Sequence, residues 1–498
     1  MRSGGIIYLD HAATTPVDLA VAREMSESLS LFGNAASTTH VFGRAAAARI
    51  EQARAQVAAL IGAAPEEIIF TSGATEADNL AILGAVRANA YRGRHVITAR
   101  TEHKAVLDPC RHLEKEGFTV TYLVPDRAGR IDPEAVRAAL REDTVLVSIM
   151  HVNNEIGVIQ DIEAIGAICR ERDILFHTDA AQAVGKVLLD VRYLKVNLLS
   201  FTAHKIYGPK GIGALYVHRA SRPRLQAVSF GGGQERGLRP GTLPTHQILG
   251  FGAACALASE RLEADRQRLT SLRDRLWQGL ASLGGVHLNG AESPRVAHIL
   301  NVSFEGVEGE SLVTGLKELA VSAGAACSSA SGDASYVLRA LGRGTVLAQG
   351  SLRFSPGRGT TEADIDEAVA AVRREVQRLR ALSPASEEAM AAPAGAEAGA
   401  GRQVILGEAG SPEKEAWVRF ILAVEGQLVK AARAQVWGCP HTMTVAAQLA
   451  ERLPGRHRDD LVPDDPARWA GLYGVPLERL GRLLTIEDAL RDCLQHWT

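Results

Sequence analysis

Cysteine is scarce in this chain of 498 residues, and no two of its six cysteines form a C-x-x-C pair. This scatter argues against a disulfide framework and against a local zinc knuckle, so each thiol is considered alone. The six residues are Cys110, Cys169, Cys255, Cys327, Cys439 and Cys493.

An excess of charge of either sign is also missing. The chain has 55 Lys and Arg residues against 57 Asp and Glu residues, a net charge of −2, which gives no indication of nucleic-acid binding. Long apolar runs and a charged-then-apolar leader are lacking as well, so we expect a cytoplasmic protein with no membrane contact. What the chain does have is 46% hydrophobic residues, enough for a large core in two or three domains.

Short apolar runs alternate with stretches of helical periodicity. This alternation predicts an α/β fold with a mainly parallel sheet, and the expected strands are 67–70, 95–98, 145–150, 174–177 and 197–201. Polar residues follow each run, and the carboxyl ends of parallel strands lie at one edge of their sheet. We therefore expect a single ligand-binding crevice formed by residues 71–75, 102–104 and 153–155 with Asp179 and Lys205.

Lys205 follows the last of these runs. Thr202 and His204 precede it and a glycine-rich turn follows, a setting that suits an amine carrying a carbonyl cofactor as a Schiff base. Asp179 ends the preceding run, where it can pair with a protonated pyridine nitrogen, and the small residues 71–76 open a helix that favours a phosphate. Pyridoxal phosphate needs these groups together. Taken alone, Lys205 is also compatible with a surface lysine at a turn, and Asp179 with a helix cap.

A break in composition divides the chain near its last fifth. Residues 384–412 are rich in Ala, Gly, Glu and Pro and have few side chains able to anchor a core, which is typical of a flexible linker. A polar helix expected from Ser259 to about Leu283 leads into a smaller subdomain. The expected units are a large domain with its N-terminal arm at 1–260, a small α+β domain at 261–383, the linker, and a C-terminal domain at 413–498.

Six segments resemble the cysteine desulfurases of the NifS/IscS type, and the resemblance runs from about Tyr8 to Ser383. The segments are 9–16, 71–79, 101–106, 151–157, 200–213 and 322–341. The resemblance implies a pyridoxal-phosphate enzyme of fold type I that acts as a homodimer. It further implies conversion of L-cysteine to L-alanine, with the sulfur left as a persulfide for iron–sulfur cluster or other thio-cofactor biosynthesis.

The same resemblance implies roles for individual residues. Lys205, His103 and Cys327 would be catalytic. Arg353, Asn154 and Asn34 would bind the substrate; the alternative for Arg353 is a solvated surface arginine. The cofactor would be held by Lys205, Ala74, Thr75, Asp179, Gln182, Thr202, His204, Asn154 and, from the second subunit, Thr242.

Cys327 lies in a run of small residues, 322–335, that has no large apolar anchor. A free cysteine is usually a small buried hydrophobe, but these surroundings cannot pack a core, so we expect a mobile loop and a reachable thiol. Sulfur transfer requires a thiolate that attacks the substrate sulfur and then carries the persulfide elsewhere. This loop resembles the longer catalytic loop of the NifS/IscS group.

Beyond the linker, the strand-like segments 417–424 and 428–437 flank a turn at Gly426, and helices are expected at 445–453 and 486–497. This unit resembles the U-type iron–sulfur scaffolds. The scaffolds of that family use three cysteines, and only one of them has a counterpart in this chain, Cys439. Arg482 and Gly481 stand where the family has its last cysteine and the neighbouring histidine.

No metal site is assigned, because Cys439 with His441 does not complete a tetrahedral set. Cys439 is a candidate sulfur acceptor or ligand of a transient iron–sulfur cluster, and Cys327 is a second candidate ligand. The unit could also be a docking module or a regulator, and a flexible tether would raise the effective concentration of Cys439 near Cys327.

Two other functions stay open from the residues. One is a different pyridoxal-phosphate enzyme, such as a selenocysteine lyase or an aminotransferase. The other is an assembly platform that captures an iron–sulfur scaffold or another sulfur-acceptor protein, with turnover secondary. Intact Lys205, His103 and Cys327 favour the desulfurase.

Overall fold

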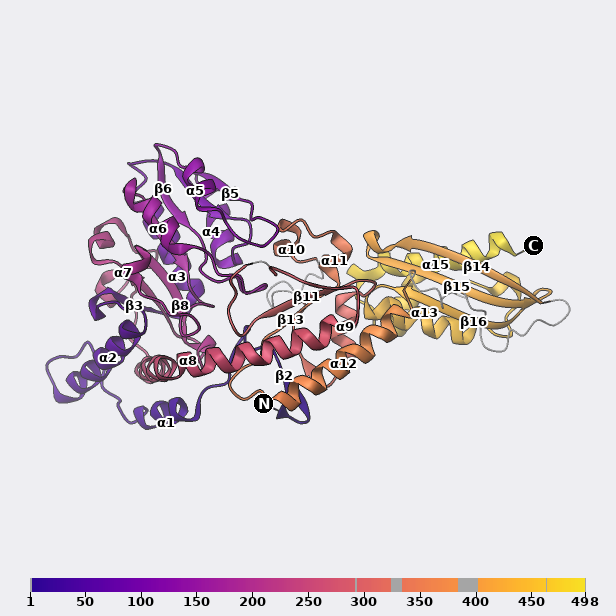
Figure 1. Ribbon diagram of the computed structural model, residues 1–498, viewed down its shortest axis with the longest axis horizontal. Helices are drawn as coiled ribbons and strands as arrows, with labels where there is room; N and C mark the ends of the chain where they lie inside the picture. The colour runs from indigo at the N-terminus through magenta and orange to yellow at the C-terminus, as the bar shows by residue number, and fades with distance from the viewer. Residues whose placement is uncertain (1, 292, 324–333, 384–401, 463, 498) are drawn as a thin grey trace.

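The structure is a computed structural model that describes residues 2–291, 293–323, 334–383, 402–462 and 464–497. The molecule is elongated (Figure 1). A large α/β domain forms one end, a small domain lies in the middle, and a C-terminal domain projects at the other end.

Seven strands form the sheet of the large domain. β9 runs antiparallel to both of its neighbours, and the pairs from β8 to β5 are parallel. This order confirms the expected mainly parallel sheet and adds two strands, β5 and β9, that the apolar pattern did not indicate. In sheet order the strands are β3 (Ile68–Thr71), β9 (Gly213–Val217), β8 (Leu198–Thr202), β7 (Leu175–Asp179), β6 (Thr144–Ser148), β4 (His95–Ala99) and β5 (Thr119–Leu123).

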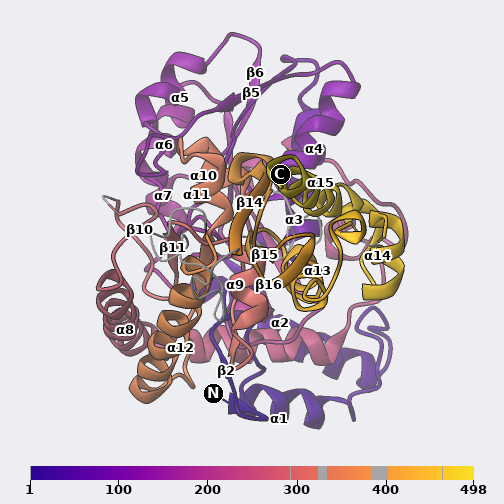
Figure 2. The ribbon, with the colours of Figure 1, turned by 90° about the vertical axis from the view of Figure 1, so that its right-hand side faces the viewer.

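Helices cover both faces of this sheet (Figure 2). Leu146 and Leu198 enter a core with α3 and α4, whereas their neighbours Val147 and Leu199 enter a second core with α2, α6 and α8. Burial on both faces explains why these strands are continuous apolar runs without alternation. The helices before α8 are α1 (Leu19–Ser28), α2 (Val41–Leu60), α3 (Ala74–Ala88), α4 (Lys104–Lys115), α5 (Pro133–Ala139), α6 (Ile162–Glu171) and α7 (Val191–Leu194).

A single long helix, α8 (Thr245–Ala281), joins the large and small domains. Phe251 packs in the large-domain core and Leu276 in the small-domain core. The helix begins well before the expected Ser259. Its first part is buried on most sides and lacks the polar face of the rest, so the sequence pattern did not indicate it as an amphipathic helix.

The small domain is an antiparallel sheet backed by helices. The strand order is β10-β11-β13, and the N-terminal β2 pairs in parallel with β12, so the arm of the chain belongs structurally to this domain. The elements are β1 (Arg2–Ser3), β2 (Ile6–Tyr8), β10 (Val286–Leu288), β11 (Leu300–Phe304), α9 (Gly309–Gly315), β12 (Leu319–Ala320), α10 (Tyr336–Ala340), α11 (Thr345–Gln349), β13 (Ser351–Phe354) and α12 (Glu362–Arg380).

The C-terminal domain is a three-stranded antiparallel sheet covered by helices. Gly426, at φ +57°, and Gln427 form the expected two-residue turn between β15 and β16. Trp469, Phe420 and Leu483 are buried in its core. The elements are β14 (Arg402–Ser411), β15 (Ala416–Glu425), β16 (Leu428–Trp437), α13 (Pro440–Arg452), α14 (Pro466–Tyr473) and α15 (Leu480–His496).

The expected linker, 384–412, is wrong at its C-terminal end. Residues 402–411 form β14, which pairs along its whole length with β15, and Ile405 is buried in the core. The C-terminal domain therefore includes residues 402–411, which the expected boundary at 413 left out. β14 lies at the edge of the sheet and contributes few core side chains, so its composition resembles that of a loop.

The C-terminal domain packs against the small domain beside α9 and α11 (Figure 1). Met443 of α13 contacts the hydrophobic cores of both domains. A cavity of about 350 Å³ remains between them. Polar contacts across this interface join Ser311 Oγ to the Gly438 carbonyl (2.7 Å), Gln349 Nε2 to Glu415 Oε1 (2.9 Å) and Arg479 to Glu310 (3.1 Å).

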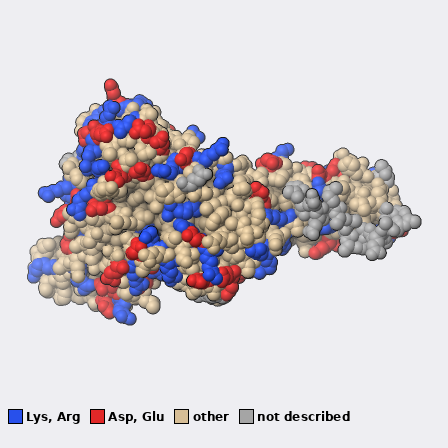
Figure 3. Space-filling view, in the orientation of Figure 1, with Lys and Arg blue, Asp and Glu red and all other residues tan. Residues whose placement is uncertain are grey.

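The surface agrees with the balanced composition. Basic and acidic side chains are interspersed over the face shown in Figure 3. Among the helices of the described residues, none has both the length and the apolar character needed to cross a bilayer.

Candidate active site

A cavity of about 460 Å³ opens at the carboxyl ends of the parallel strands of the large domain. It brings together polar groups that the strand order was expected to gather: the turn after β3, the residues after β4 and β6, and the ends of β7 and β8. Of the predicted site residues, those that line it are Ala74, Thr75, His103, Asn154, Asp179, Gln182, Thr202, His204 and Lys205.

Lys205 lies directly after β8, in a short 3₁₀ turn. Its Nζ donates a hydrogen bond to the carbonyl of Ala12, at 2.9 Å. Gln182 Nε2 donates to the same carbonyl, at 2.8 Å. The N-terminal arm thus supplies the acceptor that holds the lysine amine at the cavity.

The turn before α3 is built to receive an anion. Gly73 occupies the N-cap and has no side chain to bond the first N–H groups of this 15-residue helix, so those groups and the positive end of the helix dipole favour a phosphate. Thr75 on the helix and Thr202 at the end of β8 bring hydroxyls to the same cavity.

His204 adds a neutral hydrogen-bonding group. Burial, together with the positive charges of Lys205 and Lys210, lowers the pKa of His204 to about 4. Its Nδ1 lies 3.2 Å from Thr14 Oγ1. The imidazole is therefore uncharged at neutral pH, and it can offer an N–H to an anion without adding a charge.

Asp179 ends β7 at the floor of the cavity, where its Oδ1 accepts a hydrogen bond from the Ala181 N–H at 2.9 Å. Burial, and next the charge of Asp179, raise the pKa of the neighbouring Asp78 well above its usual range. Burial also raises the pKa of Glu102, and the Asp179 charge adds to that effect. Both shifts favour the neutral form of the two buried carboxyls beside Asp179.

His103 caps the N-terminus of α4. Its Nδ1 accepts a hydrogen bond from the Ala105 N–H at 3.1 Å. In the neutral ring the proton must then be on Nε2. A fixed tautomer beside the cavity suits a group that stacks on a ring and exchanges protons with a substrate.

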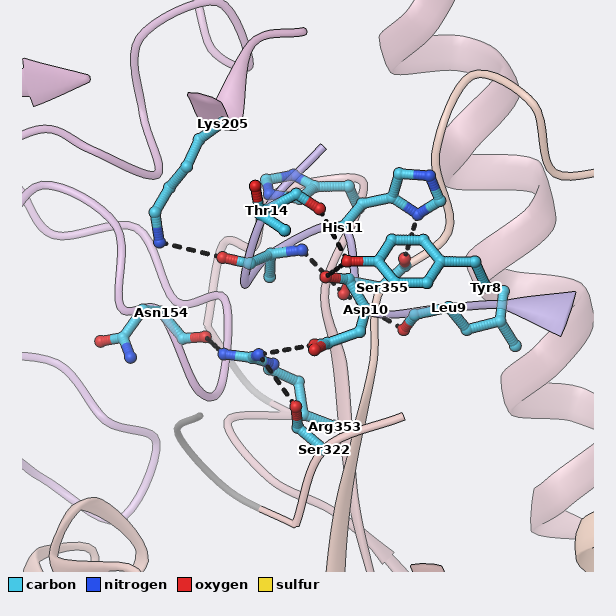
Figure 4. A network of polar contacts seen from close by, with 12 residues as sticks. Tyr8, Leu9, Asp10, His11, Thr14, Asn154, Lys205, Ser322, Arg353 and Ser355 are labelled. Carbon is cyan, nitrogen blue, oxygen red and sulfur yellow. Dashed lines mark hydrogen bonds and ion pairs between the residues drawn. The ribbon is translucent and has the colours of Figure 1, made fainter. Parts of the chain in front are cut away.

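Arg353 does not line the cavity; it lies behind Asn154 (Figure 4). Its side chain is 2% exposed, so it is not the solvated arginine of the alternative interpretation. Nη1 donates to the Asn154 carbonyl at 2.8 Å, and Nη2 pairs with Asp10 at 2.8 Å. Arg353 thus adjoins the cavity through Asn154.

Two further predicted residues, Asn34 and Thr242, do not line this cavity. Asn34 is exposed, and its Oδ1 accepts from the Ala36 N–H. Thr242 is exposed on a loop, as a group that serves a second subunit would be. Cys327 lies outside the described residues.

This donor set fits pyridoxal phosphate. A helix N-terminus without a side-chain cap faces the phosphate position, a carboxylate is available for the ring nitrogen, and an amine is available for the aldehyde. The cavity gathers these groups from three separate strand ends.

Comparison with known proteins identifies the family. The family model described as "Aminotransferase class-V" matches residues 7–368. A cysteine desulfurase IscS from Pectobacterium atrosepticum is 60% identical over 381 residues, which cover 76% of this chain and 94% of the relative. The chain belongs to the cysteine desulfurases of the class-V aminotransferase family.

Other relatives agree with this membership. IscS from Salmonella schwarzengrund is 58% identical over the same shares of the two chains. A solved "NifS-like protein" superposes with a TM-score of 0.69 at 35% identity, covering 75% of this desulfurase and 100% of that chain. DndA from Streptomyces lividans gives a TM-score of 0.60 at 42% identity, with 70% and 99% covered.

The family model ends at residue 368, so it does not reach the C-terminal domain of this desulfurase. There Cys439 caps α13 and is fully buried. Its Sγ lies 3.4 Å from Thr442 Oγ1, and hydrogen bonding and charge from Cys439 and Glu415 outweigh burial to raise the pKa of Arg482. Among the described residues, no three His, Cys, Asp or Glu side chains could hold a metal ion.

The sequence places Glu102 at the expected crevice but indicates no role for it, nor for Asp78 or Asp10. Asp78 and Glu102 lie inside the segments that carry the resemblance, yet only the structure shows that burial raises the pKa of both carboxyls. Asp10 lies in another of these segments, and the resemblance implies no role for it. Its partner Arg353 lies far along the chain, and no local signal indicated the pairing.

Proposed function

We propose that this cysteine desulfurase binds pyridoxal phosphate at Lys205 and passes the sulfur of L-cysteine to Cys327. The observation that supports this most directly is the convergence of Lys205, Asp179 and the uncapped start of α3 on one cavity. When bound, the cofactor supplies an aldehyde for the substrate amine and an electron sink for its Cα.

The residues of the chain would then divide the work. Thr75, Thr202 and His204 would hold the phosphate, Gln182 the ring oxygen and Asp179 the ring nitrogen. Lys205 would move the Cα proton once its amine is released from the aldehyde, and the Ala12 carbonyl gives that amine a hydrogen-bond acceptor close by. His103, with its proton on Nε2, would stack on the ring and act as acid or base.

Arg353 and Asn154 would hold the substrate carboxylate, for which a guanidinium offers a two-pronged donor. The thiolate of Cys327 would form a bond to the substrate sulfur as the carbon–sulfur bond breaks. The electron pair of the broken bond stays with the carbon fragment, which is protonated and leaves as alanine. A persulfide on Cys327 then passes to an acceptor protein, the route by which sulfur would reach iron–sulfur clusters.

A homodimer is the assembly that these surfaces support. Thr242 is exposed and does not line the cavity of its own chain, and large apolar side chains are exposed on and around α1 and the start of α2. A second copy would cover them and receive Thr242 at its phosphate. The apolar residues are Leu19, Leu29, Phe32, Val41 and Phe42.

The C-terminal domain would be a docking module derived from a U-type scaffold. Its hairpin and helices agree with that resemblance, but Arg482 pairs with Glu415 at 2.7 Å beside the one retained cysteine. Cys439 is fully buried beside Thr442 of its own domain, so a role as sulfur acceptor or cluster ligand would require this region to open.

A paired substitution tests the proposal. Cys327→Ala is expected to keep the yellow, cysteine-binding protein and to form no persulfide from ³⁵S-labelled cysteine, with sulfide release lost in the presence of a thiol reductant. The matched variant Cys439→Ala should retain labelling at Cys327. Full sulfide production by Cys327→Ala would contradict the assignment of the sulfur-accepting thiol.

A further inference from the structure

The N-terminal arm, residues 8–15, forms a short loop between the cavity and Arg353 that internal hydrogen bonds stabilise (Figure 4). The Tyr8 hydroxyl donates to the carbonyls of Asp10, at 3.1 Å, and Thr14, at 2.9 Å. Burial, and next the charge of Asp10, raise the pKa of Tyr8 to about 12. The hydroxyl therefore stays protonated and keeps donating at every physiological pH.

The arm is fixed to the strand that carries Arg353. Ser355, which follows β13, donates its N–H to the Leu9 carbonyl at 2.6 Å, and its Oγ accepts from the Ala12 N–H at 2.9 Å. The same residue accepts from the His11 N–H through its carbonyl, at 3.2 Å. These bonds to the backbone of the arm place Asp10 beside Arg353 independently of the contact between their side chains.

Asp10 and Arg353 then form a closely fitted pair. The arginine side chain is 2% exposed and that of Asp10 is 18% exposed, and Nη2 lies 2.8 Å from Oδ1. Nη1 donates to the Asn154 carbonyl at 2.8 Å, and Nη2 also lies 3.4 Å from Ser322 Oγ. A long flexible side chain is thus held at both terminal nitrogens.

One nitrogen of the guanidinium group has no partner among the described residues. It is Nε of Arg353, which is buried. A guanidinium has five N–H donors, so the contacts to Asp10 and Asn154 do not exhaust it. A buried donor without a partner is costly, and a carboxylate ligand is the acceptor that the proposed substrate would bring.

We propose that Asp10 is a positioning residue for substrate recognition. It fixes the Nη2 end of Arg353 so that the Nε–H is presented to the substrate carboxylate, and it does so without competing for that donor. The inference rests on the proposed function, in which Arg353 binds the carboxylate of L-cysteine.

The arm also couples the two ends of an amino-acid substrate. Asp10 holds the group that would bind the carboxylate, and two residues later the Ala12 carbonyl holds the amine of Lys205, at the position where the substrate amine would react. A shift of the arm would therefore alter both distances together, whereas loss of the Asp10 side chain alone alters only the carboxylate end.

The test compares two ligands on the full chain loaded with pyridoxal phosphate, in a Cys327→Ala background that stops turnover. The probes are L-cysteine and cysteamine, which has the same amine and thiol but no carboxylate. Dissociation constants come from the change in visible absorption on titration. Asp10→Ala should weaken L-cysteine binding about tenfold and leave cysteamine within about twofold, by the general cost of losing one charge-assisted contact.

Asp10→Asn is the conservative variant. It keeps an oxygen acceptor for Nη2, so L-cysteine affinity should recover most of the loss. Should Asp10→Ala fail to load the cofactor, Asp10→Ser repeats the measurement, because serine preserves a polar arm but cannot reach Nη2. In the enzyme with Cys327 intact, the loss is expected in KM rather than in kcat.

Two results would overturn the proposal. Equal weakening of L-cysteine and cysteamine would show that Asp10 only supports the fold of the arm, and no weakening of either would show that Arg353 needs no positioning. The variant Arg353→Gln distinguishes a failure of the Asp10 proposal from a failure of the proposed function. If that variant leaves the L-cysteine to cysteamine ratio unchanged, then Arg353 does not bind the carboxylate, whatever Asp10 does.

Discussion

Lys205 and Cys439 occupy similar local positions in two different sheets, with opposite outcomes. Each follows the end of a strand: Lys205 is the last residue of the 3₁₀ turn after β8, and Cys439 is the N-cap of α13 after β16. In front of Lys205 lies a cavity of about 460 Å³, whereas Cys439 is buried beside Thr442 and Arg482. The comparison shows that a reactive side chain at a strand end becomes a functional site only where the neighbouring elements leave space for a ligand.

The largest expected effect is at Lys205. Lys205→Ala should lower cysteine turnover by at least about a thousandfold, because it removes both the covalent anchor and a proton carrier. Alanine production from cysteine measures this. Lys210→Ala, at a second lysine lining the same cavity, is the matched control and should retain most of the activity. A comparable loss in both variants would indicate that only the positive charge of the cavity matters.

Next in size is the core of the C-terminal domain. Trp469 is 1% exposed, so Trp469→Ala should lower the free energy of unfolding of this domain by about 3–5 kcal/mol. Urea unfolding followed by circular dichroism would show the C-terminal transition moving to lower urea. Leu472→Ala, on the same helix and 60% exposed, is the control. If desulfurase activity fell in parallel with the stability of the C-terminal domain, then the active site would depend on that domain.

An intermediate effect is expected on the stability of the large domain at acidic pH. Burial lowers the pKa of His177, next to Ser148 and Ser200 in the large sheet, to about 3. The unfolded chain takes up a proton below about pH 6.5, and the folded chain does not. Stability from this group is therefore present above pH 6.5 and is lost as pH falls toward 3, by about 2 kcal/mol at pH 5.

His177→Gln keeps hydrogen-bonding capacity and cannot titrate. Urea unfolding at pH 7.5 and pH 5 should show a smaller acid loss in the variant than in the natural chain. The difference belongs to the large-domain transition. Equal acid losses in the two proteins would argue against a neutral buried His177.

The smallest effect is at the domain interface beside Gly438, the residue before Cys439. Ser311→Ala removes the hydrogen bond to the Gly438 carbonyl, which should weaken docking by about 1 kcal/mol and raise the alkylation rate of Cys439 about fivefold. Mass spectrometry of the Cys439 peptide measures the rate. Ser282→Ala, which removes two hydrogen bonds within the small domain only, should leave the alkylation rate unchanged. Fast alkylation of Cys439 in the unmodified protein would restore it as a candidate sulfur acceptor.

The sequence predicts the parts of this protein that depend on local pattern. The buried parallel strands are continuous apolar runs, and polar residues at their ends lie at one edge, so the cavity around Asp179 and Lys205 follows from the order of the strands. The hairpin around Gly426 is equally local. Residue roles were implied by the resemblance, and composition alone would not have assigned Gln182 or His103.

What escaped prediction depends on contacts between distant segments. Asp10 and Arg353 are 343 residues apart, and β14 became a strand only through pairing with β15. The burial of Cys439 depends on how α15, with Arg482, folds back over the start of α13. None of these partners is visible from the local sequence around the residue concerned.

The carbonyl of Ala12 accepts hydrogen bonds from both Lys205 and Gln182, and this acceptor belongs to the main chain. Replacing side chains one at a time cannot delete it, so a mutational scan would register position 12 only as a limit on side-chain size. The residue type at position 12 can therefore change while the contact between its carbonyl and Lys205 persists. Exchanging the amide that follows Ala12 for an ester would weaken the carbonyl as an acceptor and expose a dependence hidden from genetics.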